Sequence, residues 1–198
     1  MIKTIDDLLL EYQNYQNPYS KISREEKSGK LVKLKRGLYE DNKNCDPFSV
    51  ASYIYSPSYI SFETALSYYG LIPEEVKIIT SATFHKNKRK EYKNSIGYFV
   101  YEDVPLRVFP YGNETIIIND YTIAIASKEK SISDMLYKKQ PVHSIKDIRD
   151  LLFEDLRINE SVFDTLDFTL LDSLCDLYKN NNHKMVKKML RKDNLISS

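Results

Sequence analysis

The chain has 198 residues, 42% of them hydrophobic, and a formal net charge of +1 at pH 7. That length suffices for one or two packed domains. No cationic signal-peptide start is present, and no apolar run approaches the roughly 18 residues of a membrane-spanning helix. The two cysteines, Cys45 and Cys175, stand far apart in the sequence. We therefore expect a cytoplasmic protein with reduced thiols and no membrane contact.

Two helices are predicted near the N-terminus. Thr4 and Asp7 have the spacing of a capping box, with aspartate in place of the usual glutamate. The apolar residues after this cap recur with the helical period: Ile5, Leu8, Leu9 and Tyr12. Asn17 and Pro18 are an N-cap residue and a first helical residue, and they predict a second helix over 18–28. A glycine ends that second helix.

The segment "KLVKLKRGLYE", residues 30–40, predicts a β-hairpin with Gly37 at its turn. Side chains alternate along a strand, so Val32, Leu34 and Leu38 would share one face, while Lys33 and Lys35 would point to the other. Two interpretations are open. The lysines protect an exposed edge strand from pairing with neighbouring molecules, or they bind phosphate groups.

The order helix, turn, short polar helix, basic hairpin is that of a winged helix-turn-helix. Residues 18–40 carry seven Lys or Arg against three acids, a local balance that favours binding to DNA phosphates. One departure is that winged helices usually have three helices before the wing, and only two are evident here. The predicted DNA-binding residues come from the second helix and the hairpin: Tyr19, Ser20, Lys21, Ser23, Arg24, Lys27, Lys30, Lys33, Lys35 and Arg36.

Two longer segments resemble one bacterial family. "NPYSKISREEKSGKLVKLKRGLY" (17–39) and "SPSYISFETALSYYGLIPE" (56–74) are similar to the AbiEi family, with a weaker match in "SISDMLYK" (131–138). AbiEi proteins are the antitoxin and regulator half of abortive-infection toxin–antitoxin pairs. The resemblance implies an N-terminal winged helix that binds promoter DNA and represses its own operon. It also implies a C-terminal domain that counteracts a nucleotidyltransferase-like toxin, without necessarily forming a stable complex with it.

The predicted fold class is α+β, with the winged helix in residues 1–43 and a mixed α/β domain in 44–198. Helices over 48–55 and 61–69, the second with Ser61 as its cap, are candidates to complete the winged-helix core, which would move the boundary toward residue 80. Strands are expected next, and the C-terminal part from residue 131 has the helical period, so we expect a small sheet covered by C-terminal helices. The expected strands are 76–84, 95–102, 106–109, 115–119 and 121–127; the helices include one capped by Ser144, 165–179 and 183–193.

Two basic runs lie in the second part of the chain. They are either solvated surface or a polyanion-binding surface through which the antitoxin acts, with RNA or a substrate of the toxin as its partner. The candidate residues are Lys86, Lys88, Arg89, Lys90 and Lys93 in the first run, and Lys184, Lys187, Lys188 and Arg191 at helical spacing in the second.

Enzyme motifs are weak in this sequence. The three histidines lack metal-ligand spacing, and no phosphate-binding loop or G-x-S-x-G motif is present. Glu75 and Lys77 resemble half of a Mg²⁺-dependent nuclease site, but no partner aspartate is evident on a neighbouring strand. Asp134 is a conceivable catalytic acid, although a cap or first-turn role in its helix explains it better. We expect no enzyme activity, cofactor or metal.

The sequence therefore predicts a DNA-binding antitoxin that represses its own operon, with promoter DNA, arranged as inverted repeats, as its partner. Two rival hypotheses remain. One is an antidote that acts by direct contact with the toxin, and the other is a Mg²⁺-dependent nuclease.

Overall fold

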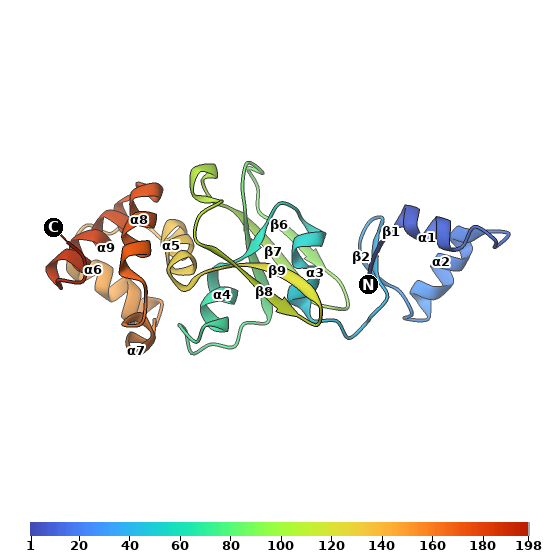
Figure 1. Cartoon of the computed structure of the whole chain (residues 1–198), viewed down its shortest axis with the longest axis horizontal. Helices are drawn as coiled ribbons and strands as arrows, with labels where there is room; N and C mark the ends of the chain where they lie inside the picture. Colours follow the sequence, from blue (N-terminus) through green and yellow to red (C-terminus); the bar gives the residue numbers. More distant parts are fainter. Residues whose placement is uncertain (198) are drawn as a thin grey trace.

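The computed structural model describes residues 1–197 and divides along its long axis into three parts (Figure 1). Two helices and a three-stranded sheet form one end, a six-stranded sheet with two helices forms the middle, and a group of helices forms the other end. The chain is thus a mixed α+β protein with a small sheet and C-terminal helices, as predicted. Among the described residues, no helix combines the length and the apolar character needed to cross a bilayer.

The N-terminal part is built from local signals that the sequence displays. The Thr4 and Asp7 capping box is present at α1, and the Asn17 side chain accepts a hydrogen bond from the N–H of Ser20 at the start of α2. A short strand precedes α1 and pairs with the second strand of the hairpin, giving the order β1-β3-β2. The elements are β1 (Ile2–Thr4), α1 (Ile5–Glu11), α2 (Pro18–Lys27), β2 (Val32–Lys35) and β3 (Leu38–Glu40).

The middle part is a mixed sheet with strand order β6-β7-β5-β4-β9-β8. The pairs β5–β7 and β4–β9 are parallel, and the other three are antiparallel. Its strands are β4 (Tyr59–Ile60), β5 (Ile78–Thr83), β6 (Lys90–Lys93), β7 (Tyr98–Asp103), β8 (Asn113–Ile118) and β9 (Tyr121–Ala126). The associated helices are α3 (Pro47–Ile54), α4 (Phe62–Tyr68) and the short 3-10 turn η1 (Leu106–Val108).

The C-terminal helices lie at the end of the molecule opposite the N-terminal part, with α5 between the six-stranded sheet and the other helices (Figure 1). Ser127 and Asn180 cap two of them, and Ser144 forms a capping box with Asp147. The elements are α5 (Lys128–Lys138), α6 (Ile145–Arg149), the π-helical segment η2 (Asp150–Asp155), α7 (Glu160–Phe163), α8 (Phe168–Tyr178) and α9 (Asn181–Lys192).

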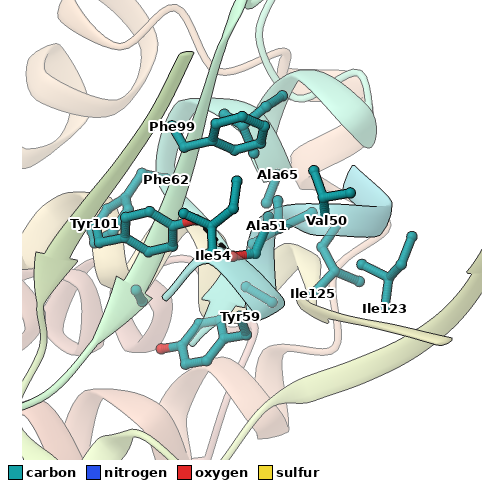
Figure 2. Packing of buried hydrophobic residues seen from close by; sticks show 14 of the residues in the cluster. Val50, Ala51, Ile54, Tyr59, Phe62, Ala65, Phe99, Tyr101, Ile123 and Ile125 are labelled. Carbon is teal, nitrogen blue, oxygen red and sulfur yellow. Dashed lines mark hydrogen bonds between the residues drawn. The ribbon is translucent and has the colours of Figure 1, made fainter. Parts of the chain in front are cut away.

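Each part has its own buried cluster. Leu8, Ile22 and Tyr39 belong to a small core between α1, α2 and the hairpin. The largest cluster lies between α3 and the six-stranded sheet, where Val50 and Ile125 meet (Figure 2). A third cluster fills the space among the C-terminal helices. The N-terminal part thus has a core of its own, which α3 and α4 do not enter.

Several predicted elements differ from those observed. Residues 106–109 were expected to form a strand but contain η1, because Pro105 precedes a tight turn rather than a paired edge. Ser61 is the N-cap residue of α4, yet its side chain makes no capping hydrogen bond. α5 begins at Lys128, so Asp134 lies in the middle of that helix and has no capping role. The strands β1, β4 and β6 were not predicted.

Candidate nucleic-acid interface

The outer face of α2 is polar and exposed. Ile22 is the buried residue of this helix, and it holds α2 against α1 and the hairpin. Because Ile22 faces inward, the residues on the opposite side of the helix face solvent. The exposed predicted residues of α2 are Tyr19, Ser20, Ser23, Arg24 and Lys27. The helix therefore presents hydroxyl and cationic groups, the donors that contact phosphates and base edges.

Lys21 differs from these neighbours because it is half-buried. Its ammonium lies 2.7 Å from the Glu25 carboxylate and 5.1 Å from the ring centroid of Tyr15. The hydrogen bond to Glu25 raises the pKa of Lys21, and the same contact lowers the pKa of Glu25. Tyr12 also donates to Glu25. These contacts engage Glu25, one of the two acidic residues of α2, so its charge is compensated locally by Lys21 and does not oppose the cations on the outer face.

The hairpin adds three further exposed cations: Lys30, Lys33 and Arg36. Within residues 1–197, none of the three takes part in an ion pair. Gly37, with φ +76°, turns the chain directly after Arg36, and its carbonyl accepts a hydrogen bond from the N–H of Ile5. This hydrogen bond holds the hairpin tip at the start of α1, so the backbone that carries Arg36 has a defined position.

Lys35 departs from the prediction that it faces solvent or a partner. Its ammonium donates a 2.6 Å hydrogen bond to the carbonyl of Ile54, at the last residue of α3. The register of the hairpin shifts between Lys33 and Lys35, so strict alternation fails at this point. Lys35 therefore anchors the hairpin to the middle part of the protein.

The apolar face of the hairpin also packs differently from expectation. Val32, Leu34 and Leu38 do share a cluster, but it is the cluster of α3 and the six-stranded sheet. Leu31 and Tyr39 instead face α1 and α2. The hairpin is thus buried on both sides, and only its cationic margin and tip remain exposed. Two side-chain bonds reinforce this docking: Asn94 donates to the carbonyl of Leu34 at 3.2 Å, and Tyr121 donates to Glu40 at 3.2 Å.

The first basic run of the second part surrounds β6. Asp103 accepts hydrogen bonds from the N–H groups of Lys86 and Asn87, both 2.8 Å long, and so fixes the loop before the strand. The Arg89 guanidinium pairs with the Glu91 carboxylate at 2.9 Å, so the positive charge of Arg89 is partly compensated. Lys88 and Lys93 are exposed, and Lys86 and Lys90 are half-buried.

Lys138 of α5 joins Lys88 and Arg89 around a shallow cavity of about 250 Å³. Sequence reasoning missed Lys138 because it lies in a separate helix. It pairs with Glu102, and burial together with the charge of Arg89 lowers its pKa. The carboxylates of Glu102 and Asp103 also line this cavity, so its charge is mixed.

The second basic run lies on α9 at the far end of the molecule (Figure 1). Lys184, Lys188 and Arg191 are exposed. Lys187 does not belong with them, because its ammonium lies 3.1 Å from Asp172 and 2.6 Å from Asp176 of α8. These two carboxylates raise the pKa of Lys187 against the opposing effect of burial. The predicted basic face of α9 is therefore reduced to three cations.

The two residues that resemble half of a nuclease site lie on the surface. Glu75 and Lys77 are exposed in the loop before β5. Across residues 1–197, no three His, Cys, Asp or Glu side chains gather in a way that would hold a metal ion. The described residues around Glu75 thus do not form the cluster of ligands that would hold the metal ion of such a reaction.

Asp134 lies at the centre of a buried polar network between the sheet and the C-terminal helices. Tyr59 and Ser61 donate hydrogen bonds of 2.9 and 2.6 Å to one carboxylate oxygen, and Tyr178 donates to the other. The Lys130 ammonium donates to the Val108 carbonyl and to the Tyr178 hydroxyl, both at 2.8 Å. Burial raises the pKa of both tyrosines and lowers that of Lys130.

This network has a structural role rather than a catalytic one. Lys130, Asp134 and Ser61 have 0% exposure, so a substrate has no access to them. Buried polar groups are retained when their hydrogen-bonding capacity is met, and here the bonds connect Lys130 and Asp134 of α5 with β4, α8 and η1. The network fastens α5 and α8 to β4 and η1.

The candidate site is therefore the exposed margin of α2 and the β2–β3 hairpin, which holds most of the predicted DNA-binding residues on one docked unit. No protein-family model matches the chain, and no curated protein shows significant similarity to it.

Proposed function

We propose that this protein is an AbiEi-type antitoxin that binds promoter DNA through its N-terminal unit and represses its own operon. The observation that supports this most directly is the group of exposed cations on α2 and the hairpin: Arg24, Lys27, Lys30, Lys33 and Arg36. The strand, helix, turn, helix and hairpin that carry them are consistent with a winged helix in which α2 reads the major groove.

The cations fit the two kinds of contact that such a protein makes. Ser20, Ser23 and Arg24 lie on the exposed face of the helix that would enter the groove, where they would contact base edges and phosphates. Lys33 and Arg36 lie on the hairpin, where they would contact the phosphate backbone beside the groove. Each phosphate contact releases condensed counterions, so binding should weaken steeply as salt rises.

The second part of the proposal concerns the toxin. The middle and C-terminal parts would counteract a nucleotidyltransferase-like toxin through their exposed cations, which are Lys88, Lys93, Lys184, Lys188 and Arg191. A protein that acts on the toxin's substrate or product would not co-purify with the toxin, whereas an antidote that acts by contact would. Co-expression of the two proteins with a tag on one of them separates these mechanisms.

The decisive experiment is fluorescence anisotropy with the intergenic DNA upstream of the gene, at several salt concentrations. We compare the natural protein with K33A/R36A, which removes two exposed hairpin cations and leaves the anchoring Lys35 in place. The matched control is K77A/K146A, which removes two exposed lysines from other parts of the chain.

If Lys33 and Arg36 each contact a phosphate, the K33A/R36A variant lowers the slope of log affinity against log salt by about 1.8. The control keeps the natural slope and affinity. Binding of the natural protein no tighter than to random DNA, or an equal loss in the control, would overturn the proposal.

A further inference from the structure

The two edges of the six-stranded sheet differ in chemistry. One edge is β6, a four-residue strand whose sequence is KEYK. Lysines on a short edge strand hinder pairing with another molecule, because their charges would have to be desolvated. The other edge is β8, a six-residue strand with the sequence NETIII. It has no lysine or proline, and its register with β9 is continuous from Asn113 to Ile118.

The turn after β8 determines which of its backbone groups are free. Asn119 and Asp120 both have positive φ, at 48° and 67°, as in a two-residue type I′ turn. Ile118 and Tyr121 flank this turn and form the hydrogen-bonded pair that closes it. Since hydrogen bonding alternates along the strand, Ile118, Ile116 and Glu114 bond to β9. The N–H and C=O groups of Asn113, Thr115 and Ile117 therefore point away from the sheet.

The side chains of the same edge are unusual for a solvated surface. Ile117 is 75% exposed, although Ile116 and Ile118 pack against the cluster between α3 and the sheet. An exposed, regular edge with apolar β-branched residues is a template for adding another strand.

We propose that β8 pairs antiparallel with β8 of a second copy of this chain, around a two-fold axis at Thr115. The three residues with outward-pointing backbone groups then meet one another: Asn113 lies opposite Ile117 of the second copy, Thr115 opposite Thr115, and Ile117 opposite Asn113. The two six-stranded sheets become one continuous sheet, joined by main-chain hydrogen bonds at each of these pairs.

Two features favour a second copy over a strand of another protein. In this register Glu114 lies opposite Ile116 of the second copy, so like charges are not placed directly opposite each other across the axis. The two-fold contact also uses the same patch on both molecules and leaves only β6 edges, which their lysines protect. The assembly therefore closes at two copies. This inference does not depend on DNA binding, but it would place two N-terminal units on one particle, in the number that matches the two half-sites of an inverted repeat.

Sedimentation velocity of the full-length protein, from low micromolar to several hundred micromolar, tests the proposal. We expect a species of twice the 23.2 kDa chain mass that dissociates on dilution. I117K introduces a charge on the edge, and T115P removes the central outward N–H; each should weaken the dimer at least tenfold. T122K is the matched control, because Thr122 lies directly opposite Ile117 on the inner strand β9.

Circular dichroism of each variant establishes that it folds, and if T115P does not, I117K still decides the question. A natural protein that stays monomeric at every concentration would overturn the proposal, and would leave the edge for a strand of a different protein. A dimer that survives I117K, or one that T122K disrupts equally, would also overturn it. The sedimentation experiment does not measure DNA binding, so its result does not depend on whether the proposed function is correct.

Discussion

The Lys130 ammonium lies 3.5 Å from the Asp134 carboxylate, one turn further along α5, and both side chains have 0% exposure. Burial of either charge alone is costly, whereas the pair together with its hydrogen bonds offsets that cost. The pair also bridges separate layers, since Asp134 accepts from β4 and α8 while Lys130 donates to η1 and α8. Its removal should therefore affect how the C-terminal helices attach to the sheet.

We expect K130M to lower the free energy of unfolding by about 3–5 kcal/mol, because the Asp134 charge would remain buried without its cation. D134N should be costly for the converse reason. The double variant K130M/D134N buries neither charge, so its loss should be clearly smaller than the sum of the two single losses. Urea denaturation followed by circular dichroism measures all four proteins. Additive losses would show that the two groups are not coupled.

His183 should make stability depend on pH. Its ring stacks on Tyr178 with centroids 4.3 Å apart, its Nδ1 lies 2.5 Å from the Asn180 side-chain oxygen, and its Nε2 lies 3.1 Å from the Ser133 carbonyl. Burial lowers the pKa of His183 to about 3 against the opposing effect of the hydrogen bond to the Ser133 carbonyl, and the nearby Lys130 charge also lowers it. In the unfolded chain the imidazole titrates near its ordinary value of about 6.5.

Between these two pKa values the unfolded chain binds one more proton than the folded protein does. The stability contributed by neutral His183 is therefore fully present above about pH 6.5 and is lost as the pH falls, by at most about 1.4 kcal/mol per pH unit. H183F keeps an aromatic ring beside Tyr178 and removes the titration. We expect the natural protein to lose more stability than H183F between pH 7 and pH 5, in urea denaturation at each pH. Parallel pH profiles would contradict the assignment.

The sequence predicted those parts of the fold that depend on local signals. The capping boxes at Thr4 and Ser144 and the cap at Asn17 are present where their spacing placed them. These motifs involve residues three positions apart, so their geometry is complete within the motif. The exposed cations Lys30, Lys33 and Arg36 are likewise evident from the sequence, because exposed charges need no partner to be recognised.

Features that depend on distant partners were missed. β4 has two residues and exists because β5 and β9 pair with its two sides. The sequence pattern places Asp134 at a helix start, but its partners Tyr59, Ser61 and Tyr178 lie 44 to 75 residues away in sequence. Strand alternation predicts that Lys35 is exposed, because it reveals neither a register shift nor a carbonyl at the end of another helix.

Substitution of Lys33 should therefore affect mainly DNA binding, whereas substitution of Lys35 should affect mainly stability. K35A removes a charged hydrogen bond to the Ile54 carbonyl, which we expect to lower the free energy of unfolding by about 1.5–3 kcal/mol. K33A removes an exposed lysine and should change stability by less than about 0.5 kcal/mol. Thermal or urea denaturation measures this difference, with each variant also tested in the DNA-binding assay. Equal stability losses would show that the bond to Ile54 contributes little in solution.

Gly112 and Gly29 allow the effect of crowding to be separated from that of backbone conformation. Both have positive φ, at 70° and 72°, so alanine at either position adopts a strained conformation costing about 1–2 kcal/mol. A Cβ at Gly112 would also lie 3.0 Å from the Lys130 Cβ and 3.4 Å from a Leu174 methyl group, whereas at Gly29 nothing lies within 4 Å. Overpacking typically adds about 1–3 kcal/mol, so G112A should destabilise the protein more than G29A does, by that amount. The two variants are compared by urea denaturation, in which strain common to both cancels. Equal losses would mean that α5 and α8 move apart readily, and would also weaken the case that the Lys130 network holds these layers rigidly together.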